Sequence, residues 1–329
     1  MTFNEKNFIH EYLHPNLSNF DELALRLYHH QLDHNVILHN YVHLTQSSKR
    51  PQTLAEVTFL PIQFFKTHAV KTGSFNDEAV FTSSSTTGIT PSKHHVASMA
   101  LYQQTYLKAF SQAYGNPEQY VFLCLLPNYL ERTGSSLVSM AQGLIEASAQ
   151  QEEGFYLYNF NELQNCLNKP LPSSKQFFLL GVTFALLDFA STYPQPLQQT
   201  IVMETGGMKG RGPEKTREEI HTYLKQQLQI QQIHSEYGMT ELLSQAYSKG
   251  EGRYVCPPWM KVVITDINDP FTKLKIGKAG LINVIDLANI HSCAFIQTQD
   301  IGRLHPDGTF EVLGRVDFSE SRGCNLMYV

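Results

Sequence analysis

The spacing of apolar residues changes along this chain from a helical period to short strand-like runs at about residue 75. Residues 5–47 place leucine and histidine at helical spacing and predict helices over 5–13, 18–28 and 30–46. Beyond them, short β-rich runs alternate with longer helical segments, which is typical of an α/β fold with a partly parallel sheet. These later helices are expected over 93–113, 134–150, 184–192 and 213–228, and strands over 78–83, 120–126, 154–158, 177–182, 199–204, 232–236, 260–266, 280–285 and 310–313.

Three local signals refine this prediction. An irregular segment over 51–75 contains two prolines and separates the first helices from the remainder. Turn residues at 268–270 and 307–308 predict hairpins, and hence a smaller antiparallel part near the end of the chain. The apolar stretch 177–190 is too short and too interrupted to span a bilayer, so it predicts a buried strand that runs into a turn and a helix.

Composition narrows the function classes. The chain has 329 residues, 42% hydrophobic and 17% charged, and its net charge of -5 gives no basic surface for nucleic acid. The N-terminus lacks the apolar core of a signal peptide. The five cysteines are odd in number, widely spaced and without a C-x-x-C pair, which favours free thiols in a cytoplasmic setting. They are Cys124, Cys166, Cys256, Cys293 and Cys324.

One metal-binding pattern is weak. Residues 10–14 read His-Glu-Tyr-Leu-His, which on a helix would place two histidines on one face around zinc. Pro15 biases His14 away from helical geometry, and no third ligand follows. With 14 histidines in the chain, a chance match is not rare. A zinc hydrolase is therefore the most distant of the functions considered.

A hydroxyl-rich turn points to phosphate. Residues 81–88 read Phe-Thr-Ser-Ser-Ser-Thr-Thr-Gly between an expected strand and an expected helix, with Lys93 near the start of that helix. Backbone N–H groups, hydroxyls and a lysine at such a junction suit a polyphosphate. An ordinary polar loop would have the same composition.

Three later segments complete a possible nucleotide site. Residues 235–241 read Ser-Glu-Tyr-Gly-Met-Thr-Glu, in which an aromatic ring beside a glycine can stack on a base and a carboxylate can hold a divalent cation. Residues 204–212 are rich in glycine, which allows the backbone to approach a planar ligand closely. Residues 299–303 and 314–317 supply an acidic residue and an arginine that could hold a ribose and a phosphate.

In this order the segments resemble the adenylate-forming superfamily of acyl-CoA synthetases, luciferases and peptide-synthetase adenylation domains. Within it, the chain looks most like the acyl-protein synthetase (LuxE) family, which supplies acyl groups to a fatty-acid reductase in bacterial bioluminescence. The resembling segments span nearly the whole chain: LPIQFFKTH (60–68), LLPNYLERTGSSLVSMAQGL (125–144), LLGVTFALL (179–187), TGGMKGR (205–211), EYGMTELLSQAY (236–247) and RGCNL (322–326).

The resemblance implies an ATP-dependent ligase with Mg²⁺ as cofactor and the superfamily's large-domain fold. By that likeness the phosphates would be held by Ser83, Ser84, Ser85, Thr86, Thr87, Gly88 and Lys93, with Thr240 nearby. The adenine would be framed by Gly206, Gly207, Tyr237 and Gly238. Asp300 and Arg315 would hold the ribose, and Glu241 would hold magnesium.

Two departures from the superfamily pattern matter. Ser85 stands where the phosphate loop usually has glycine, and the Pro-Lys step comes later here, at 91–93. Most superfamily members also continue past the Gly-Arg-x-Asp hinge, which is 314–317 here, into a mobile domain of about a hundred residues. This chain ends twelve residues after Asp317, so we expect no such domain and no lysine from it.

A cysteine in the tail offers a substitute acceptor, since the acyl-protein synthetase family is acylated near its C-terminus. Cys324 is the seventh residue after Asp317, which allows at most about 25 Å of extended chain between them. Gly323 gives freedom, and the arginines at 315 and 322 favour a thiolate. An inert tail thiol is the simpler alternative on position alone.

The predicted organisation is therefore one adenylation domain over 1–329, with a helical region at 1–75, an α/β core at 76–317 and a tail at 318–329. The predicted reaction activates a carboxylic acid, a fatty acid by resemblance, and passes the acyl group through Cys324 to a partner such as an acyl reductase. An acid–CoA or acid–carrier-protein ligase and a non-catalytic nucleotide- or acyl-binding protein remain alternatives. The acyl pocket is not readable; its candidates are Tyr129, Leu130, Phe184 and Trp259, for which a role in the hydrophobic core is the stronger interpretation.

Overall fold

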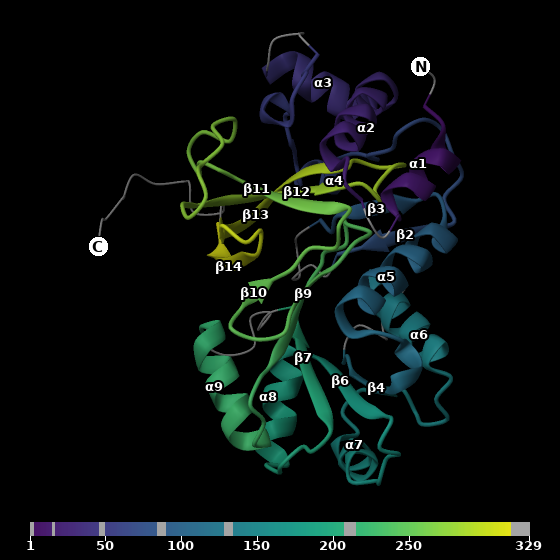
Figure 1. Cartoon of the computed structure of the whole chain (residues 1–329), viewed down its shortest axis with the longest axis vertical. Coiled ribbons are helices and arrows are strands. Elements are labelled where there is room, and N and C mark those ends of the chain that lie inside the picture. The colour runs from purple at the N-terminus through teal and green to yellow at the C-terminus, as the bar shows by residue number, and fades with distance from the viewer. Residues whose placement is uncertain are drawn as a thin grey trace.

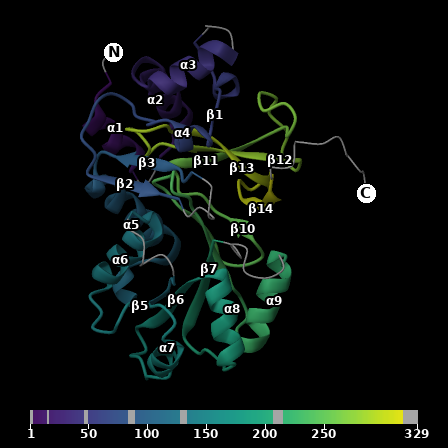
Figure 2. The same cartoon turned by 180° about the vertical axis from the view of Figure 1, so that it is seen from behind.

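The described residues of the computed structural model form two six-stranded sheets and a separate two-stranded one, with helices around them (Figures 1 and 2). The structure describes residues 3–14, 17–45, 50–83, 90–127, 134–206 and 215–316. In Figure 1 the N-terminal helices lie at the top, above the antiparallel sheet, and the mainly parallel sheet fills the lower half. No helix among these residues is long and apolar enough to cross a lipid bilayer.

The mainly parallel sheet has the strand order β5-β4-β6-β7-β8-β9, and only the β8–β9 pair is antiparallel. Its strands are β4 (Tyr120–Leu125), β5 (Phe155–Tyr156), β6 (Gln176–Val182), β7 (Thr200–Thr205), β8 (His234–Tyr237) and β9 (Ala246–Ser248). Every residue of β4 is buried, as expected for a parallel strand that is covered on both faces.

Helices cover both faces of this sheet. They are α5 (Met99–Tyr114), α6 (Ser136–Ser148), α7 (Phe160–Leu167), α8 (Thr183–Thr192) and α9 (Arg217–Leu228). Both views place α5 and α6 on one side and α8 and α9 on the other. The apolar stretch over 177–190 forms β6 and α8, which confirms the predicted strand and helix.

The second sheet has the order β10-β14-β13-β12-β11 and is antiparallel apart from β1, which pairs with β13 in parallel. Its strands are β1 (Leu60–Pro61), β10 (Arg253–Tyr254), β11 (Met260–Thr265), β12 (Ala279–Asp286), β13 (Phe295–Leu304) and β14 (Phe310–Arg315). The two turns predicted near 268–270 and 307–308 join β11 to β12 and β13 to β14, so the expected antiparallel part is confirmed.

The N-terminal helices are α1 (Glu5–Tyr12), α2 (Phe20–His34) and α3 (Val36–Thr45). The predicted break between the second and third helix, near residue 29, is wrong. Asn35 sets the break, because its side-chain oxygen accepts hydrogen bonds from the amides of Ile37 and Leu38. Its amide nitrogen donates to the carbonyl of Ser292, which ties this corner to the antiparallel sheet. The short elements that follow are η1 (Leu54–Glu56), α4 (Phe64–Thr67) and η2 (Pro117–Gln119).

The predicted helix over 93–113 is wrong at its start. Residues Lys93–Val96 form strand β3, which pairs antiparallel with β2 (Ala79–Thr82). The helix begins only at Met99, where the hydroxyl of Ser98 accepts a hydrogen bond from the amide of Leu101. Lys93 therefore lies on a hairpin and not at a helix N-terminus, because pairing with β2 overrides the local pattern.

Candidate functional site

The carboxyl ends of three parallel strands meet the last two strands of the antiparallel sheet. Gly181, Glu204 and Ser235 are register neighbours on β6, β7 and β8, so these strands end at one edge. Tyr237 at the end of β8 reaches across to Asp300 on β13. Ligands of open α/β sheets bind beyond the carboxyl ends of the strands, and this junction is therefore the candidate site.

Tyr237 joins the two sheets through its hydroxyl and its ring. The hydroxyl donates to the Asp300 carboxylate at 3.0 Å. Burial, followed by the charge of Asp300, raises the pKa of the phenol well above its ordinary value, so the hydroxyl keeps its proton. Its ring packs edge-on against Phe310 of β14 and Tyr254 of β10, with centroids 5.2 and 5.8 Å away. The chain thus fixes the orientation of this aromatic ring on several sides.

Asp300 and Arg315 are register partners on β13 and β14, with the Arg315 Nε 3.9 Å from the Asp300 Oδ1. Burial raises the pKa of Asp300 and also that of Glu241, while the charge of Arg315 opposes the rise in both. Arg315 itself remains exposed, with 66% of its side chain accessible. One guanidinium therefore acts on two carboxyl groups that the sequence places 59 residues apart (300 − 241).

The β2–β3 hairpin brings the ends of the predicted phosphate loop to the same place. The amide of Ser92 donates to the hydroxyl of Ser83 at 2.8 Å, and the amide of Ser83 donates to the carbonyl of Ser92 at 3.1 Å. The Ser92 side chain also hydrogen-bonds the Glu241 carboxylate, which is only 4% exposed. His94 on β3 donates from Nδ1 to the carbonyl of Thr240 at 2.8 Å. The hairpin and the 237–241 segment are therefore held together.

Lys93 does not share that contact. It is exposed, and as the neighbour of His94 on a strand it points to the opposite face of the hairpin. A phosphate role for Lys93 stays a prediction.

Sequence reasoning missed a polar network below this site, centred on the carboxylate of Glu204. The hydroxyls of Thr183 and Ser235 donate to its two oxygens at 2.8 and 2.9 Å. His221 Nε2 and Arg217 Nε lie 3.5 and 3.8 Å from its Oε1. Burial opposes ionisation, yet the hydrogen bonds and the nearby positive charge lower the pKa of Glu204, so it is a carboxylate anion at neutral pH. The signal in the sequence was an acidic residue, Glu204, directly after the apolar run Ile-Val-Met at 201–203.

Gly206 follows directly after this network. It has a φ of +72°, which favours glycine, and its carbonyl accepts a hydrogen bond from the Thr183 hydroxyl at 3.2 Å. The first glycine of the predicted adenine-binding segment is therefore fixed to the carboxyl end of β6.

Glu236 occupies the opposite face of the same strands. It is half-buried, and the hydroxyl of Thr205 donates to it. Burial raises its pKa to about 7, and the negative charge of Glu204 adds to the rise. Its Oε1 lies where a Cβ on Gly238 would be, at 2.2 Å from the ideal position, so residue 238 must be glycine for Glu236 to stay in place.

Several predicted site residues lie outside the described residues. They are Ser84, Ser85, Thr86, Thr87, Gly88, Gly207 and Cys324, together with the acyl-pocket candidates Tyr129 and Leu130. The other two acyl-pocket candidates, Phe184 and Trp259, are buried in the hydrophobic core, and the Trp259 indole donates to the hydroxyl of Ser244.

Within the described ranges, no group of three or more His, Cys, Asp or Glu side chains is placed to hold a metal ion. His10 lies in the last turn of α1 and His14 follows the C-cap.

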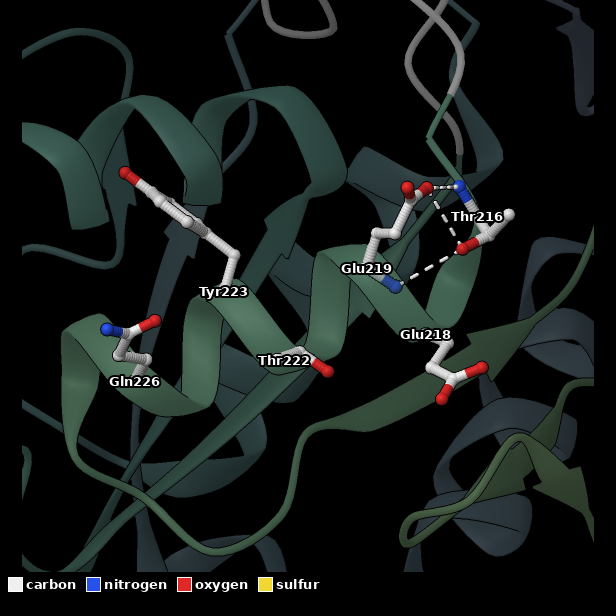
Figure 3. Close-up of a pocket in the computed structure, with 6 residues that line it drawn as sticks. All are labelled: Thr216, Glu218, Glu219, Thr222, Tyr223 and Gln226. Carbon is white, nitrogen blue, oxygen red and sulfur yellow. Dashed lines mark hydrogen bonds between the residues drawn. The ribbon is translucent and has the colours of Figure 1, made fainter.

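A hollow of about 480 Å³ runs along the surface of α9, and none of the predicted site residues is among those that line it (Figure 3). It is lined by Thr216, Glu218, Glu219, Thr222, Tyr223 and Gln226.

No protein-family model and no curated protein sequence matches the chain. Among solved structures, ATP-bound MatB from Rhodopseudomonas palustris matches with a TM-score of 0.55 at 14% identity, over 74% of this chain and 49% of that chain. A malonyl-CoA ligase, in a ternary product complex with methylmalonyl-CoA and AMP, has a TM-score of 0.51 at 19% identity over 72% and 52%. O-succinylbenzoate coenzyme A synthetase (MenE) from Bacillus subtilis, bound to AMP, has a TM-score of 0.51 at 15% identity over 72% and 49%.

These neighbours are adenylate-forming enzymes, and the chain has the α/β fold with mixed sheets of their large domain. The predicted fold class is thereby confirmed. The chain spans about half the length of the solved structures that it matches.

Proposed function

We propose that this protein uses ATP to activate a carboxylic acid as an acyl adenylate, and that Cys324 then accepts the acyl group. The observation that carries this proposal is the meeting of Tyr237, Asp300, Arg315 and Glu241 at the carboxyl edge of the parallel sheet. Nucleotide-bound enzymes of the same fold support the same ligand here.

In the first half-reaction, a carboxylate oxygen of the acid attacks the α-phosphorus of ATP. The bond from that phosphorus to the bridging oxygen breaks, and pyrophosphate leaves. The chain contributes position and charge: the fixed Tyr237 ring bounds the base, and the Asp300 carboxylate accepts hydrogen bonds from the ribose. Arg315 and the hydroxyl-rich 83–88 segment offset the charge on the phosphates.

Magnesium fits Glu241 as a single-carboxylate site. Magnesium ions at nucleotide sites commonly take one or two carboxylates and complete their shell with phosphate oxygens and water. Glu241 is nearly buried, and among the described residues no basic side chain lies within ion-pair distance of it. No described basic side chain therefore competes with a cation for the Glu241 carboxylate. A bound cation would neutralise negative charge on the phosphates.

In the second half-reaction, the Cys324 thiolate attacks the carbonyl carbon of the adenylate, and AMP leaves with the former carboxylate oxygen. Three of the described cysteines offer poor competition, since burial raises the thiol pKa of Cys124, Cys256 and Cys293. The resemblance to the acyl-protein synthetase family supports Cys324 as the acceptor, a fatty acid as the substrate and an acyl reductase as the partner.

A second candidate is an acid–CoA ligase in which Cys324 is incidental. It is favoured by the names of the neighbours, which include a malonyl-CoA ligase and a coenzyme A synthetase.

The test is intact mass after incubation with ATP, Mg²⁺ and a panel of fatty acids, for wild type, Cys324→Ser and the control Cys256→Ser. We expect an ATP-dependent, hydroxylamine-labile acyl adduct in wild type and Cys256→Ser, and none in Cys324→Ser. An adduct that persists in Cys324→Ser would exclude that acceptor. Pyrophosphate release that needs coenzyme A would favour the ligase, and no pyrophosphate with any acid would leave only a binding protein.

A further inference from the structure

Arg217 connects the two sheets that form the candidate site. It is the first residue of α9, and its Nη1 donates to the carbonyl of Val312 on β14 at 3.0 Å. Its Nε lies 3.8 Å from the Glu204 carboxylate at the end of β7. Its guanidinium also stacks over the ring of Tyr254, 5.4 Å from the centroid. One side chain thus contacts β7 of the parallel sheet and β14 and β10 of the antiparallel sheet.

The local structure holds Arg217 at this place. Thr216 and Glu219 form a capping box, in which the Thr216 hydroxyl accepts from the amide of Glu219 and the Glu219 carboxylate accepts from the amide of Thr216 (Figure 3). Gly252 approaches the guanidinium so closely that an added Cβ would lie 3.1 Å from Nη1. The cap fixes the helix start, and the glycine leaves room for the side chain.

Helix stability does not account for an arginine here. A positive charge at the first position of a helix opposes the helix dipole, so the residue is unfavourable for α9 itself. Its Nε is buried and has no hydrogen-bond partner among the described residues. The contacts to Glu204, Val312 and Tyr254 offset these two unfavourable terms.

Those contacts lead to the residues expected to hold the nucleotide. Tyr254 packs against the ring of Tyr237, and Val312 lies three residues before Arg315 on β14. Asp300 pairs with Arg315 on the adjacent strand. A shift of Arg217 would therefore move β10 and β14, and with them the Asp300–Arg315 pair, relative to the carboxyl end of β7.

We propose that Arg217 is a positioning residue for the nucleotide, which holds the carboxyl end of β7 against β10 and β14 and so supports the direct contact between Tyr237 and Asp300. This inference rests on the proposed nucleotide site. It predicts that Arg217 acts on adenosine recognition as a whole and not on the phosphates, because its contacts lead to the base and ribose sides.

The experiment is calorimetric titration of the full chain with ATP, AMP and adenosine, for wild type, Arg217→Met and Arg217→Lys. We expect Arg217→Met to weaken all three ligands by the same factor, roughly ten- to a hundredfold, as for loss of charged hydrogen bonds. Arg217→Lys should recover part of the affinity, since it keeps the charge beside Glu204 but cannot span all three contacts.

The matched control is Arg253→Met. Arg253 binds Asp307 and Thr309 at the turn between β13 and β14, so it also braces this sheet but not across the junction. Its loss should change the ATP dissociation constant by less than about twofold, as expected for an exposed ion pair.

The outcomes are distinguishable. A merely structural role would lower the fraction of protein that binds and leave the dissociation constant unchanged, which would overturn the inference. A loss confined to ATP would indicate direct phosphate contact and would also overturn it. If Arg217→Met does not fold, the dissociation constant and the fraction of binding-competent protein are compared between Arg217→Lys and wild type instead. Wild type that binds none of the three ligands would instead refute the proposed function, and the inference with it.

Discussion

At the edge of the parallel sheet where its strands end, each face carries one glutamate side chain, and the surroundings of these two acids differ. Glu204 pairs in register with Ser235, and Thr205 pairs with Glu236, so the two acids lie on neighbouring strands but on opposite faces. On the α9 face, Glu204 has two hydroxyl donors, a histidine and an arginine around it. Its pKa is lowered despite burial.

On the α5 face, Glu236 has a hydroxyl donor and mostly aromatic surroundings. Thr205 donates to it, and Tyr247 is its register neighbour on β9. Burial raises its pKa to about 7. Burial alone therefore does not decide the charge of an acid at this edge, because the donors around each carboxyl group decide it. Glu204 is an anchor for the framework, whereas Glu236 changes its charge near neutral pH.

The largest expected effect comes from replacing each acid by leucine. Glu204→Leu leaves Arg217 and His221 without their anion and two hydroxyls without an acceptor, and it should cost about 3–5 kcal/mol of unfolding free energy. Glu236→Leu should cost less than about 1 kcal/mol at pH 8, since it removes an acid that burial disfavours. Urea unfolding of both variants measures the difference. Equal losses would mean that the donors around Glu204 do not stabilise it.

The next effect is a pH dependence with opposite signs. The folded pKa of Glu236 lies above its ordinary value of 4.5, so the folded state binds the proton more tightly. Stability from this group is therefore fully present below about pH 4.5 and falls as the pH rises through about 7. For Glu204 the sign is opposite. Its folded pKa is lowered, so its contribution to stability is present above its ordinary pKa of 4.5 and is lost as the pH falls through the lower folded pKa.

Glu236→Gln isolates the first of these effects. Compared with wild type, this variant should be more stable at pH 8 by roughly 2 kcal/mol and about equally stable at pH 5. The expected gain is smaller than the full pKa shift would give, because the side chain is only half-buried. Thermal unfolding across that pH range is the measurement, with exposed Glu218→Gln as the control. A difference between wild type and Glu236→Gln that is constant with pH would contradict the raised pKa.

Much of this architecture was predictable, because strands such as β4 and β6 are buried on both faces and have nearly continuous apolar runs. The Tyr-Gly-x-Thr-Glu segment and the acid on β13 were found through their order along the chain. The strand β13 itself was missed, since its middle, residues 297–302, reads Gln-Thr-Gln-Asp-Ile-Gly, where consecutive polar side chains break the apolar pattern. The same holds for β3, whose KHHV sequence becomes a strand only through pairing with β2.

The Glu204 network was not predictable from spacing. The partners of Glu204 come from positions 183, 217, 221 and 235, on one strand and two helices, and no sequence interval relates them. Only the parallel register of β6, β7 and β8 brings these side chains to one point. A buried acid at the end of an apolar strand signals that partners exist, but it does not say which residues they are.

The two threonine substitutions should have smaller effects, because each removes a single hydroxyl donor from one of the two acids. Thr183→Val and Thr205→Val each remove one hydroxyl, from the donors of Glu204 and Glu236 respectively, with little change of shape. At pH 7 we expect Thr183→Val to cost about 1.5–2 kcal/mol, because a buried anion loses a charged hydrogen bond. Thr205→Val should cost about 0.5–1 kcal/mol at pH 5, where Glu236 is protonated, and more at pH 8.

The Thr205 hydroxyl lowers the pKa of Glu236, so its loss should also raise the pH midpoint of that group. Carbon-13 NMR of the glutamate carboxyl groups would measure the midpoint in wild type and Thr205→Val, with Thr183→Val as the reference. A midpoint that stays the same would mean that burial alone, without the hydroxyl, sets the proton affinity of Glu236. The distinction between the two faces would then rest on Glu204 and its four partners.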